Sequence, residues 1–324
     1  MRFGLLGLSV ALTWFLVVST GVSLLAAAIA ALATRRWTAK HGTRPAGWLA
    51  LRLMPSVAAG AFLTIAFGPA YLLFEPRNGT EPLRAPLVMA ALAGGLLIAL
   101  AARRVLSAGR QLASLERDWR ARATPSPTST PALPVFIVDG PGPVATLVGV
   151  LRPRLYLSRA VVEALGPEEQ AAVLAHETAH MRRRDNLARW IMLATPDLYA
   201  ATRFGIQTAE QWAAAAERLA DEEAVAGRPR MAVALASALV TVARLMPPAP
   251  RIPLPTSGLD DGGILAERVR RLLGEPAHPR RHVYAWVSAV TIAALAVGVT
   301  VASGALPLHR EVHDLTEWLV RLAW

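Results

Sequence analysis

Cysteine is absent from the 324-residue sequence, and this absence limits the chemistry available to the chain. Without thiols it can form neither disulfides nor thiolate metal sites, so any metal must be held by histidine and carboxylate side chains. Acidic residues are scarce beside basic ones: 23 stand against 34, a formal net charge of +11. Direct nucleic-acid binding is not expected despite that charge, because no stacking aromatic side chains alternate with the arginines.

Charged residues are also missing from four long stretches. A helix needs roughly 20 residues to cross a bilayer, and the four stretches are about that long or longer. These stretches lie between residues 2 and 35, and at 53–74, 85–102 and 283–308. With 54% hydrophobic residues in the chain, they predict a multi-pass α-helical membrane protein. A buried core helix is the alternative for each stretch, above all for the third, and the first could also be a cleaved signal peptide.

The distribution of basic residues predicts the orientation. The loop after the first stretch holds Arg35, Arg36, Lys40 and Arg44, and six arginines lie between residues 103 and 122, after the third stretch. The loop between the second and third stretches carries only two arginines. Because lysine and arginine concentrate on the cytoplasmic side of membrane proteins, we expect the N-terminus outside and the segment between the third and fourth stretches in the cytoplasm.

That segment shows the patterns of a mostly helical domain with a small sheet. Short strands are predicted at 135–138, 145–150 and 154–158. Helices are predicted at 107–122, 166–193, 208–227, 231–246 and 264–273. The first of these is amphipathic and is expected on the inner membrane surface, and Thr208 and Gln211 have capping-box spacing at the start of the third. Residues 123–134, rich in proline, serine and threonine, are expected to form a linker.

The sequence His-Glu-Thr-Ala-His at residues 176–180 carries the chemistry. On a helix His176 and His180 project from one face, so both imidazoles can bind one Zn²⁺. Glu177 reaches the same side and could act as the general base that takes a proton from the attacking water and passes it to the leaving amine. Two unrelated histidines on a surface helix are the alternative.

A third protein ligand is needed, and without cysteine it must be histidine, aspartate or glutamate. The predicted helix at 208–227 offers Glu217 and Asp221, which share a face four residues apart. Glu217 could bind the metal while Asp221 accepts a hydrogen bond from a liganding histidine. Glu222 and Glu223 are rival ligands, and a solvated acidic face is the alternative.

The stretch HETAHMRRRDN, preceded by GVLRPRLYLSRAVVEALGPEEQAAVLA and followed by ERLADEEA, resembles the BlaR/MecR-type antirepressor metallopeptidases, and more distantly the HtpX and CAAX-prenyl membrane proteases. The resemblance covers roughly residues 134–275. It implies a gluzincin with His176, His180 and Glu217 on zinc, Glu177 as general base and Asp221 behind a liganding histidine. It also implies that residues 154–158 form an edge strand to which an extended substrate adds.

In that family, cleavage or inactivation of a winged-helix repressor links membrane signalling to transcription. BlaR and MecR carry a penicillin-binding sensor after the last span, whereas this chain ends about twenty residues after its fourth stretch, so β-lactam sensing is not expected. The stimulus would come through the membrane helices, a partner or autoproteolysis. A short amphipathic helix is expected outside, with Val312, Leu315, Leu319 and Leu322 on one face.

The sequence therefore predicts a multi-pass α-helical membrane protein with an inserted α+β zincin-type metallopeptidase domain. The expected parts are three spans (1–104), a basic helix and linker (105–133), the cytoplasmic peptidase domain (134–280), a fourth span (281–306) and an external tail (307–324). We expect a zinc endopeptidase of the cytoplasmic membrane whose partners are the lipid bilayer and a protein substrate, such as a BlaI/MecI-like winged-helix repressor. An HtpX-like quality-control protease and a non-catalytic membrane scaffold are the alternatives.

Overall fold

The computed structural model describes residues 2–37, 44–77, 84–131, 133–140, 144–245, 257–258, 262–274 and 305–322. The chain divides into two compact units. We call Met1–Arg103, Thr195–Gln211 and Arg280–Trp324 the apolar unit, and Arg104–Ala194 and Trp212–Pro279 the sheet unit.

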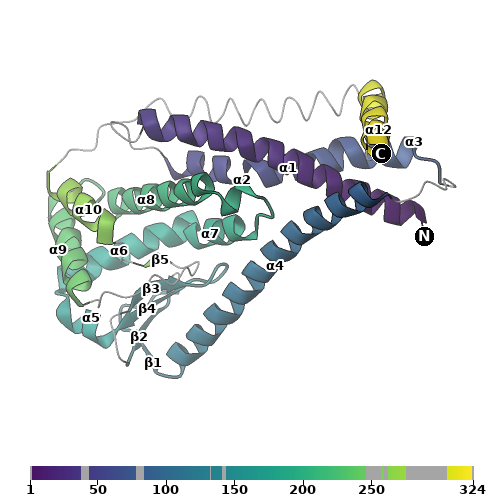
Figure 1. Ribbon diagram of the computed structural model, residues 1–324. Helices are drawn as coiled ribbons and strands as arrows, with labels where there is room; N and C mark the ends of the chain where they lie inside the picture. The colour runs from purple at the N-terminus through teal and green to yellow at the C-terminus, as the bar shows by residue number, and fades with distance from the viewer. Residues whose placement is uncertain are drawn as a thin grey trace. The chain divides into compact units, whose positions relative to one another are not determined.

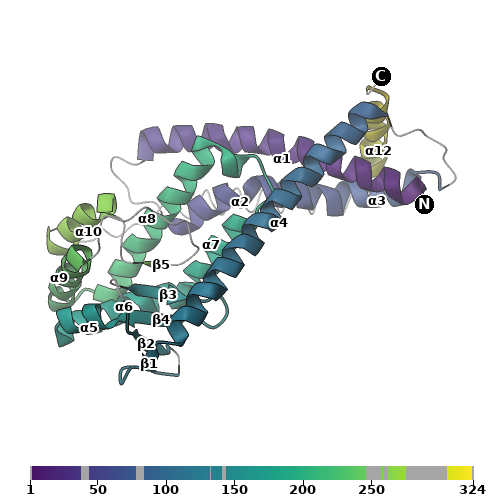
Figure 2. The ribbon, with the colours of Figure 1, turned by 60° about the horizontal axis from the view of Figure 1, so that its bottom comes forward.

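The apolar unit is built from long helices. Its elements are α1 (Arg2–Trp37), α2 (Pro45–Ala61), the π-helix η1 (Phe62–Phe67), α3 (Gly68–Phe74), the first half of α4 (Ala85–Arg120), the 3₁₀ turn η2 (Tyr199–Ala201) and α12 (Ala305–Leu322). α2, η1 and α3 follow one another without a break, and α2 lies along α1 (Figures 1 and 2). α12 packs against α3 and η1.

Within the residues that the structure describes, three helical stretches are long and apolar enough to cross a membrane: Phe3–Leu32, Pro45–Phe74 and Ala85–Arg120. They coincide with the first three stretches expected from the sequence, although the second begins at Pro45 rather than near residue 53. The chain is thus associated with a membrane through these helices. Most of the expected fourth span, 283–308, lies outside the described residues.

Close approach holds the apolar unit together. A methyl group on Gly94 of α4 would meet the carbonyl oxygen of Leu12 at 2.3 Å, so α1 and α4 touch backbone to backbone there. The Tyr71 hydroxyl donates to the Phe3 carbonyl at 2.6 Å. Arg52 of α2 forms a buried ion pair of 3.3 Å with Asp197, which attaches residues 195–211 to this unit.

α4 runs for 36 residues and continues from the expected third span through the expected amphipathic helix. The helix predicted at 107–122 is confirmed as far as Arg120, but it continues the third span without a break, and its place on the inner membrane surface stays a prediction. Leu112 is buried beside Val138, Val148 and Tyr156 of the sheet. Leu112, an apolar side chain in the arginine-rich second half of α4, therefore packs against the sheet.

The sheet unit contains five strands in the order β1-β2-β4-β3-β5. They are β1 (Ala123–Pro125), β2 (Val135–Val138), β3 (Ala145–Val148), β4 (Arg154–Ser158) and β5 (Ser257–Gly258). β2 and β4 pair in parallel and the other neighbours antiparallel. The three predicted strands are confirmed, but residues 123–125 of the expected linker form a strand. β4 lies inside the sheet between β2 and β3, so its predicted role as the edge strand for substrate is wrong.

Helices pack on this sheet and enclose the core. They are α5 (Arg159–Ala164), α6 (Pro167–Arg183), α7 (Asp185–Ala194), α8 (Arg203–Val225), α9 (Pro229–Leu245) and α10 (Gly262–Gly274). Residues of α8 from Trp212 onward belong to the sheet unit. Buried Leu155 of β4, Val173 of α6 and Leu235 and Leu239 of α9 share one apolar core, in which α6 packs against α9.

Two helix boundaries differ from those predicted. The expected helix at 166–193 is divided at Arg184 into α6 and α7, and α8 begins at Arg203 rather than at Thr208. The Thr202 hydroxyl accepts from the backbone N–H of Gly205 at 3.1 Å and so caps α8. Thr208 lies inside the helix, where its hydroxyl donates to the Phe204 carbonyl. The capping-box spacing at Thr208 was a coincidence of composition.

Candidate metal centre

The helix α6 begins as its sequence predicts and carries the His-Glu-Thr-Ala-His motif into the interior. The carboxylate of Glu169 accepts from the backbone N–H of Gly166 at 2.8 Å, and Pro167 occupies the first turn. His176, Glu177 and His180 are each only 1% exposed. Polar side chains this deeply buried need partners, since removal from water costs free energy that only hydrogen bonds, charges or a metal can offset.

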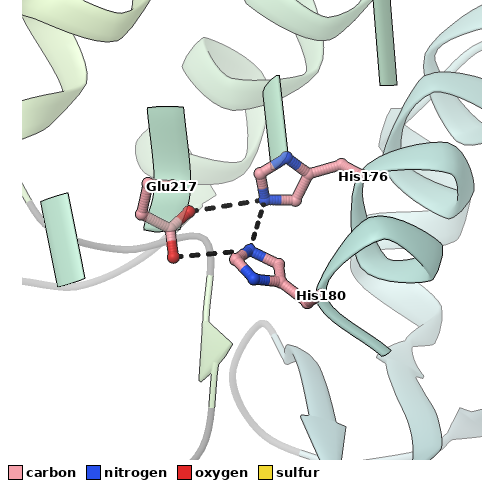
Figure 3. A group of neighbouring side chains, drawn as sticks. All are labelled: His176, His180 and Glu217. Carbon is pink, nitrogen blue, oxygen red and sulfur yellow. Dashed lines mark hydrogen bonds and ion pairs between the residues drawn. The ribbon is translucent and has the colours of Figure 1, made fainter. Parts of the chain in front are cut away.

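Three side chains face one another at this point. Nε2 of His176 and Nε2 of His180 lie 3.1 Å apart, and each is 3.4 Å from a different carboxylate oxygen of Glu217 on α8: Oε2 for His176 and Oε1 for His180 (Figure 3). In a tetrahedral zinc site with ligands at about 2.0–2.1 Å, neighbouring ligand atoms are about 3.3–3.4 Å apart. The trio therefore has the separations that a single zinc ion requires, and we call it the inner cluster.

Two further carboxylates hold the far sides of the imidazoles. Nδ1 of His176 lies 3.1 Å from Asp221, and Nδ1 of His180 donates to Asp185 at 2.6 Å. A carboxylate at Nδ1 keeps the proton on that nitrogen. In the neutral ring, Nε2 then carries the lone pair, and the two Nε2 atoms face each other and Glu217. This is an arrangement that attracts a cation.

The position of Asp185 depends on one residue of left-handed backbone. Arg184 has φ 55° and ψ 42°, ends α6, and lets α7 begin at Asp185 in a new direction. On an uninterrupted helix a residue five places after His180 would project well away from it. The break instead returns Asp185 to the ring of His180, where it is 4% exposed.

Arginines form a second layer behind these carboxylates. Arg268 of α10, 3% exposed, makes two hydrogen bonds to Asp221, at 2.7 and 2.9 Å, and its Nη1 lies 3.1 Å from Glu217. Arg183 bonds to Asp185 and donates to the Ala216 carbonyl of α8 at 2.8 Å. The acids that orient the imidazoles are thus themselves held, Asp221 by Arg268 of α10 and Asp185 by Arg183 of α6.

The electrostatics of the inner cluster follow from burial and charge together. Burial disfavours the charged form of Glu217, but His180, His176 and Arg268 outweigh it and hold the pKa of Glu217 well below its ordinary value. Burial likewise opposes an imidazolium at His180, yet the charge of Glu217 and the bond to Asp185 raise its pKa to about 10. The negative charge of Glu217 therefore favours a proton on His180, at the position where a metal ion can bind.

Glu177 differs from the other acids. Burial raises its pKa, against the opposing effect of His176 and His180. Its Oε2 is buried without a hydrogen-bond partner among the residues that the structure describes. A carboxylate with a raised pKa and an unused oxygen, one residue from a ligand position, is suited to exchange protons with a reactant.

The structure thus brings together all five residues singled out in the sequence: His176, Glu177, His180, Glu217 and Asp221. The rival ligands do not join them: Glu222 is exposed, and Glu223, 41% exposed in its side chain, lies 3.8 Å from Arg183. Sequence reasoning missed Asp185 and Arg268. Asp185 stands in the same eleven-residue stretch as the motif, but the predicted unbroken helix concealed it, and nothing in the sequence marks Arg268 as a partner of Asp221.

Residues 138–272 match the family model described as BlaR1 peptidase M56. This segment belongs to the BlaR/MecR-type metallopeptidase family. No curated protein matches the chain. The matched BlaR/MecR-type segment includes every residue of the inner cluster and its supports, from His176 on α6 to Arg268 on α10. The family is one of metallopeptidases, so a metal ion is implied, and the inner cluster supplies a histidine, histidine and glutamate set that fits one.

Proposed function

We propose that the chain is a membrane-embedded zinc endopeptidase that hydrolyses peptide bonds of a cytoplasmic protein. The observation that carries the proposal is the buried inner cluster, in which the two imidazole Nε2 atoms are 3.1 Å apart and each lies 3.4 Å from an oxygen of Glu217. The match of residues 138–272 to the BlaR1 peptidase model supports the same reaction class.

His176, His180 and Glu217 would hold the ion, which when bound supplies Lewis acidity that polarises a carbonyl and acidifies water. Glu177 takes the proton of the attacking water and passes it to the leaving amine, a role for which its raised pKa suits it. Asp185 and Asp221 keep the proton on Nδ1 of each imidazole. Their part is to orient the rings, so the active geometry exists before substrate arrives.

The test is Glu177→Gln in the full-length protein, purified and reconstituted in lipid vesicles with zinc. This change keeps the side-chain size but removes the base, so zinc content should be unchanged while cleavage of an unfolded probe such as casein falls by about 10²- to 10⁴-fold. Glu222→Gln, an exposed position on α8, is the matched control and should cleave normally. Normal cleavage by Glu177→Gln protein would refute the mechanism.

We further propose that the sheet unit faces the cytoplasm and that the N-terminus and the tail lie outside, because basic residues flank the first and third spans on one side. The cysteine-free chain makes this testable, since a single introduced thiol is the only one present. Ser107→Cys and Asp314→Cys place it at exposed positions on α4 and α12. In intact cells a membrane-impermeant maleimide should label the second and spare the first; the reverse pattern would invert the topology.

For the substrate we propose a small winged-helix repressor of the BlaI/MecI type, on the strength of the family match. A strain carrying Glu177→Gln should then accumulate one uncleaved DNA-binding protein. Accumulation of many membrane proteins instead would favour the quality-control alternative. Purified protein without zinc, or protein whose zinc content per chain does not fall after His176→Ala with His180→Ala, would favour the non-catalytic scaffold.

A further inference from the structure

A second group of metal-ligand side chains lies in the apolar unit, outside the site just described. Glu75 directly follows α3, and His313 and Glu317 lie on α12. Each offers a ligand atom, and these atoms all lie within 4.8 Å of one another. We call Glu75, His313 and Glu317 the outer cluster. Like the two histidines of the inner cluster, its two helical members are four residues apart and share one helix face.

Contacts to the preceding helices fix the orientation of α12. Nε2 of His309 donates to the Ile65 carbonyl of η1 at 3.2 Å, and the indole N–H of Trp14 donates to the Thr316 hydroxyl at 3.1 Å. The ring of His313 lies against that of Phe74 with centroids 5.8 Å apart. The His313 and Glu317 side chains are therefore directed toward the end of α3, where Glu75 stands.

Burial and charge favour a cation at this point. The Glu75 side chain is only 6% exposed, and its Oε2 lies 3.9 Å from Nδ1 of His313. A carboxylate kept out of water is held by hydrogen bonds or positive charges, and a bound ion would add to those that Glu75 has. The His313 side chain is 19% exposed, so an ion has access from solvent. The outer cluster combines a buried anchor with accessible partners.

We propose that Glu75, His313 and Glu317 form a second metal site, which binds a divalent transition-metal ion of the zinc class. An imidazole with two carboxylates suits zinc, whereas calcium and magnesium prefer sites made of oxygen alone. The 3.9 Å separation exceeds the roughly 3.3–3.4 Å of a tetrahedral site, so the side chains must close on the ion. The ion therefore binds more weakly than at the inner cluster and exchanges readily with solvent. Such exchange suits a site that senses the ion rather than one that retains it.

An ion in the outer cluster would join α12 to the end of α3. Under the orientation proposed above, the charge pattern places the end of the second span and the tail on the same, outer side, and the structure brings them together independently of that pattern. The outer cluster is thus a site where external zinc reaches the apolar unit. No residue in it corresponds to Glu177, so binding rather than catalysis is its function.

The test uses full-length protein in detergent carrying His176→Ala and His180→Ala, which abolish the inner cluster. Titration with Zn²⁺ should show one ion bound per chain, and adding His313→Gln or Glu317→Gln should weaken that binding by about tenfold or more. Asp314→Asn, an exposed neighbour on α12, is the matched control and should bind zinc as before. Thermal unfolding of each variant checks that the fold is kept.

Absence of bound zinc in the protein lacking the inner histidines would overturn the proposal. So would zinc binding that survives both His313→Gln and Glu317→Gln. Co²⁺ gives a second measurement, since its visible absorption should change when His313 is replaced. Because the peptidase proposal is tested on Glu177 and on the inner histidines, failure at the outer cluster leaves it untouched.

Discussion

The inner and outer clusters use similar ligand types with the same four-residue helical spacing, yet they differ in how far they are prepared for an ion. In the inner cluster the ligand atoms are 3.1 to 3.4 Å apart and the imidazoles are 1% exposed, with Asp185, Asp221 and two arginines behind them. In the outer cluster Nδ1 of His313 lies 3.9 Å from Glu75, and the His313 side chain is 19% exposed. The types of the ligand residues determine which ion can bind, and the residues that hold the ligands in place determine how tightly it binds.

The largest effect is expected from removing the third ligand of the inner cluster. Glu217→Ala should lower zinc affinity by more than about 100-fold and abolish casein cleavage, because the loss of a ligand exceeds the effect of losing its supports. Glu317→Ala, the corresponding acid of the outer cluster, should leave cleavage by zinc-loaded protein unchanged. Zinc retention against a competing chelator measures both. If Glu222→Ala lost zinc while Glu217→Ala kept it, the third ligand would have to be reassigned.

Smaller losses are expected from the supporting acids. Asp185→Asn and Asp221→Asn should each weaken zinc binding by about 10- to 100-fold, since an amide no longer holds the proton on Nδ1 as a carboxylate does. Both changes preserve size, and competition with a chromogenic chelator gives the affinities. Affinities equal to that of the parent would show that the supporting layer does not explain the difference between the clusters.

Zinc uptake at the inner cluster should depend on pH. Because the pKa of His180 is raised to about 10, the metal-free protein holds a proton there at neutral pH that zinc must displace. Apparent affinity should therefore rise with pH through the neutral range, by about tenfold per pH unit for one displaced proton. Calorimetry at pH 7 in two buffers with different ionisation enthalpies measures the release. Binding heats that are the same in both buffers would contradict it.

The same pKa fixes the sign of a stability effect in the metal-free protein. The imidazolium of His180 is stabilised in the folded state by Glu217 and Asp185, so this contribution is fully present below the ordinary histidine pKa and is lost as pH rises toward about 10. With zinc bound the proton is gone, and the contribution should no longer vary over that range.

The smallest effect is expected at the break between α6 and α7. Arg184 has φ 55°, a conformation that costs a residue with a side chain about 1–2 kcal/mol and glycine little. Arg184→Gly should raise the melting temperature slightly and keep zinc affinity, whereas Arg184→Val should lower both. Ala226→Gly relieves a similar backbone, φ 46°, away from the metal centre and is the control. Stable protein with full zinc affinity from Arg184→Val would show that the turn is unimportant.

Periodicity and spacing were enough to locate most of the elements. Uncharged runs located three apolar helices, and alternation between glycine and proline turns located β2, β3 and β4. His176, Glu177 and His180 followed from one helical turn, and Glu217 with Asp221 from their four-residue spacing on the helix predicted at 208–227. In each case the information is local, since it lies in residues within a few positions of one another.

What escaped prediction depended on distant packing. α4 continues past residue 102 because Leu112 finds an apolar partner in the sheet, which no local pattern reveals. The central place of β4 is set by strand order, and strand order by pairing across the chain. Arg268 meets Asp221 from 47 residues away. Asp185 is close in sequence, yet its position depends on the backbone of a single residue, Arg184, whose arginine side chain gives no warning of a left-handed turn.

The left-handed turn at Arg184 also bears on the order in which the metal centre is assembled during synthesis. His180 and Asp185 are five residues apart and can meet as soon as α6 and α7 have left the ribosome, with almost no loop to close. His176 must wait for Asp221 on α8, and Asp221 for Arg268 on α10. The nascent chain therefore carries one oriented imidazole before it carries a complete ligand set, so zinc loading, and with it any cleavage, is postponed until α8 with Glu217 has been translated.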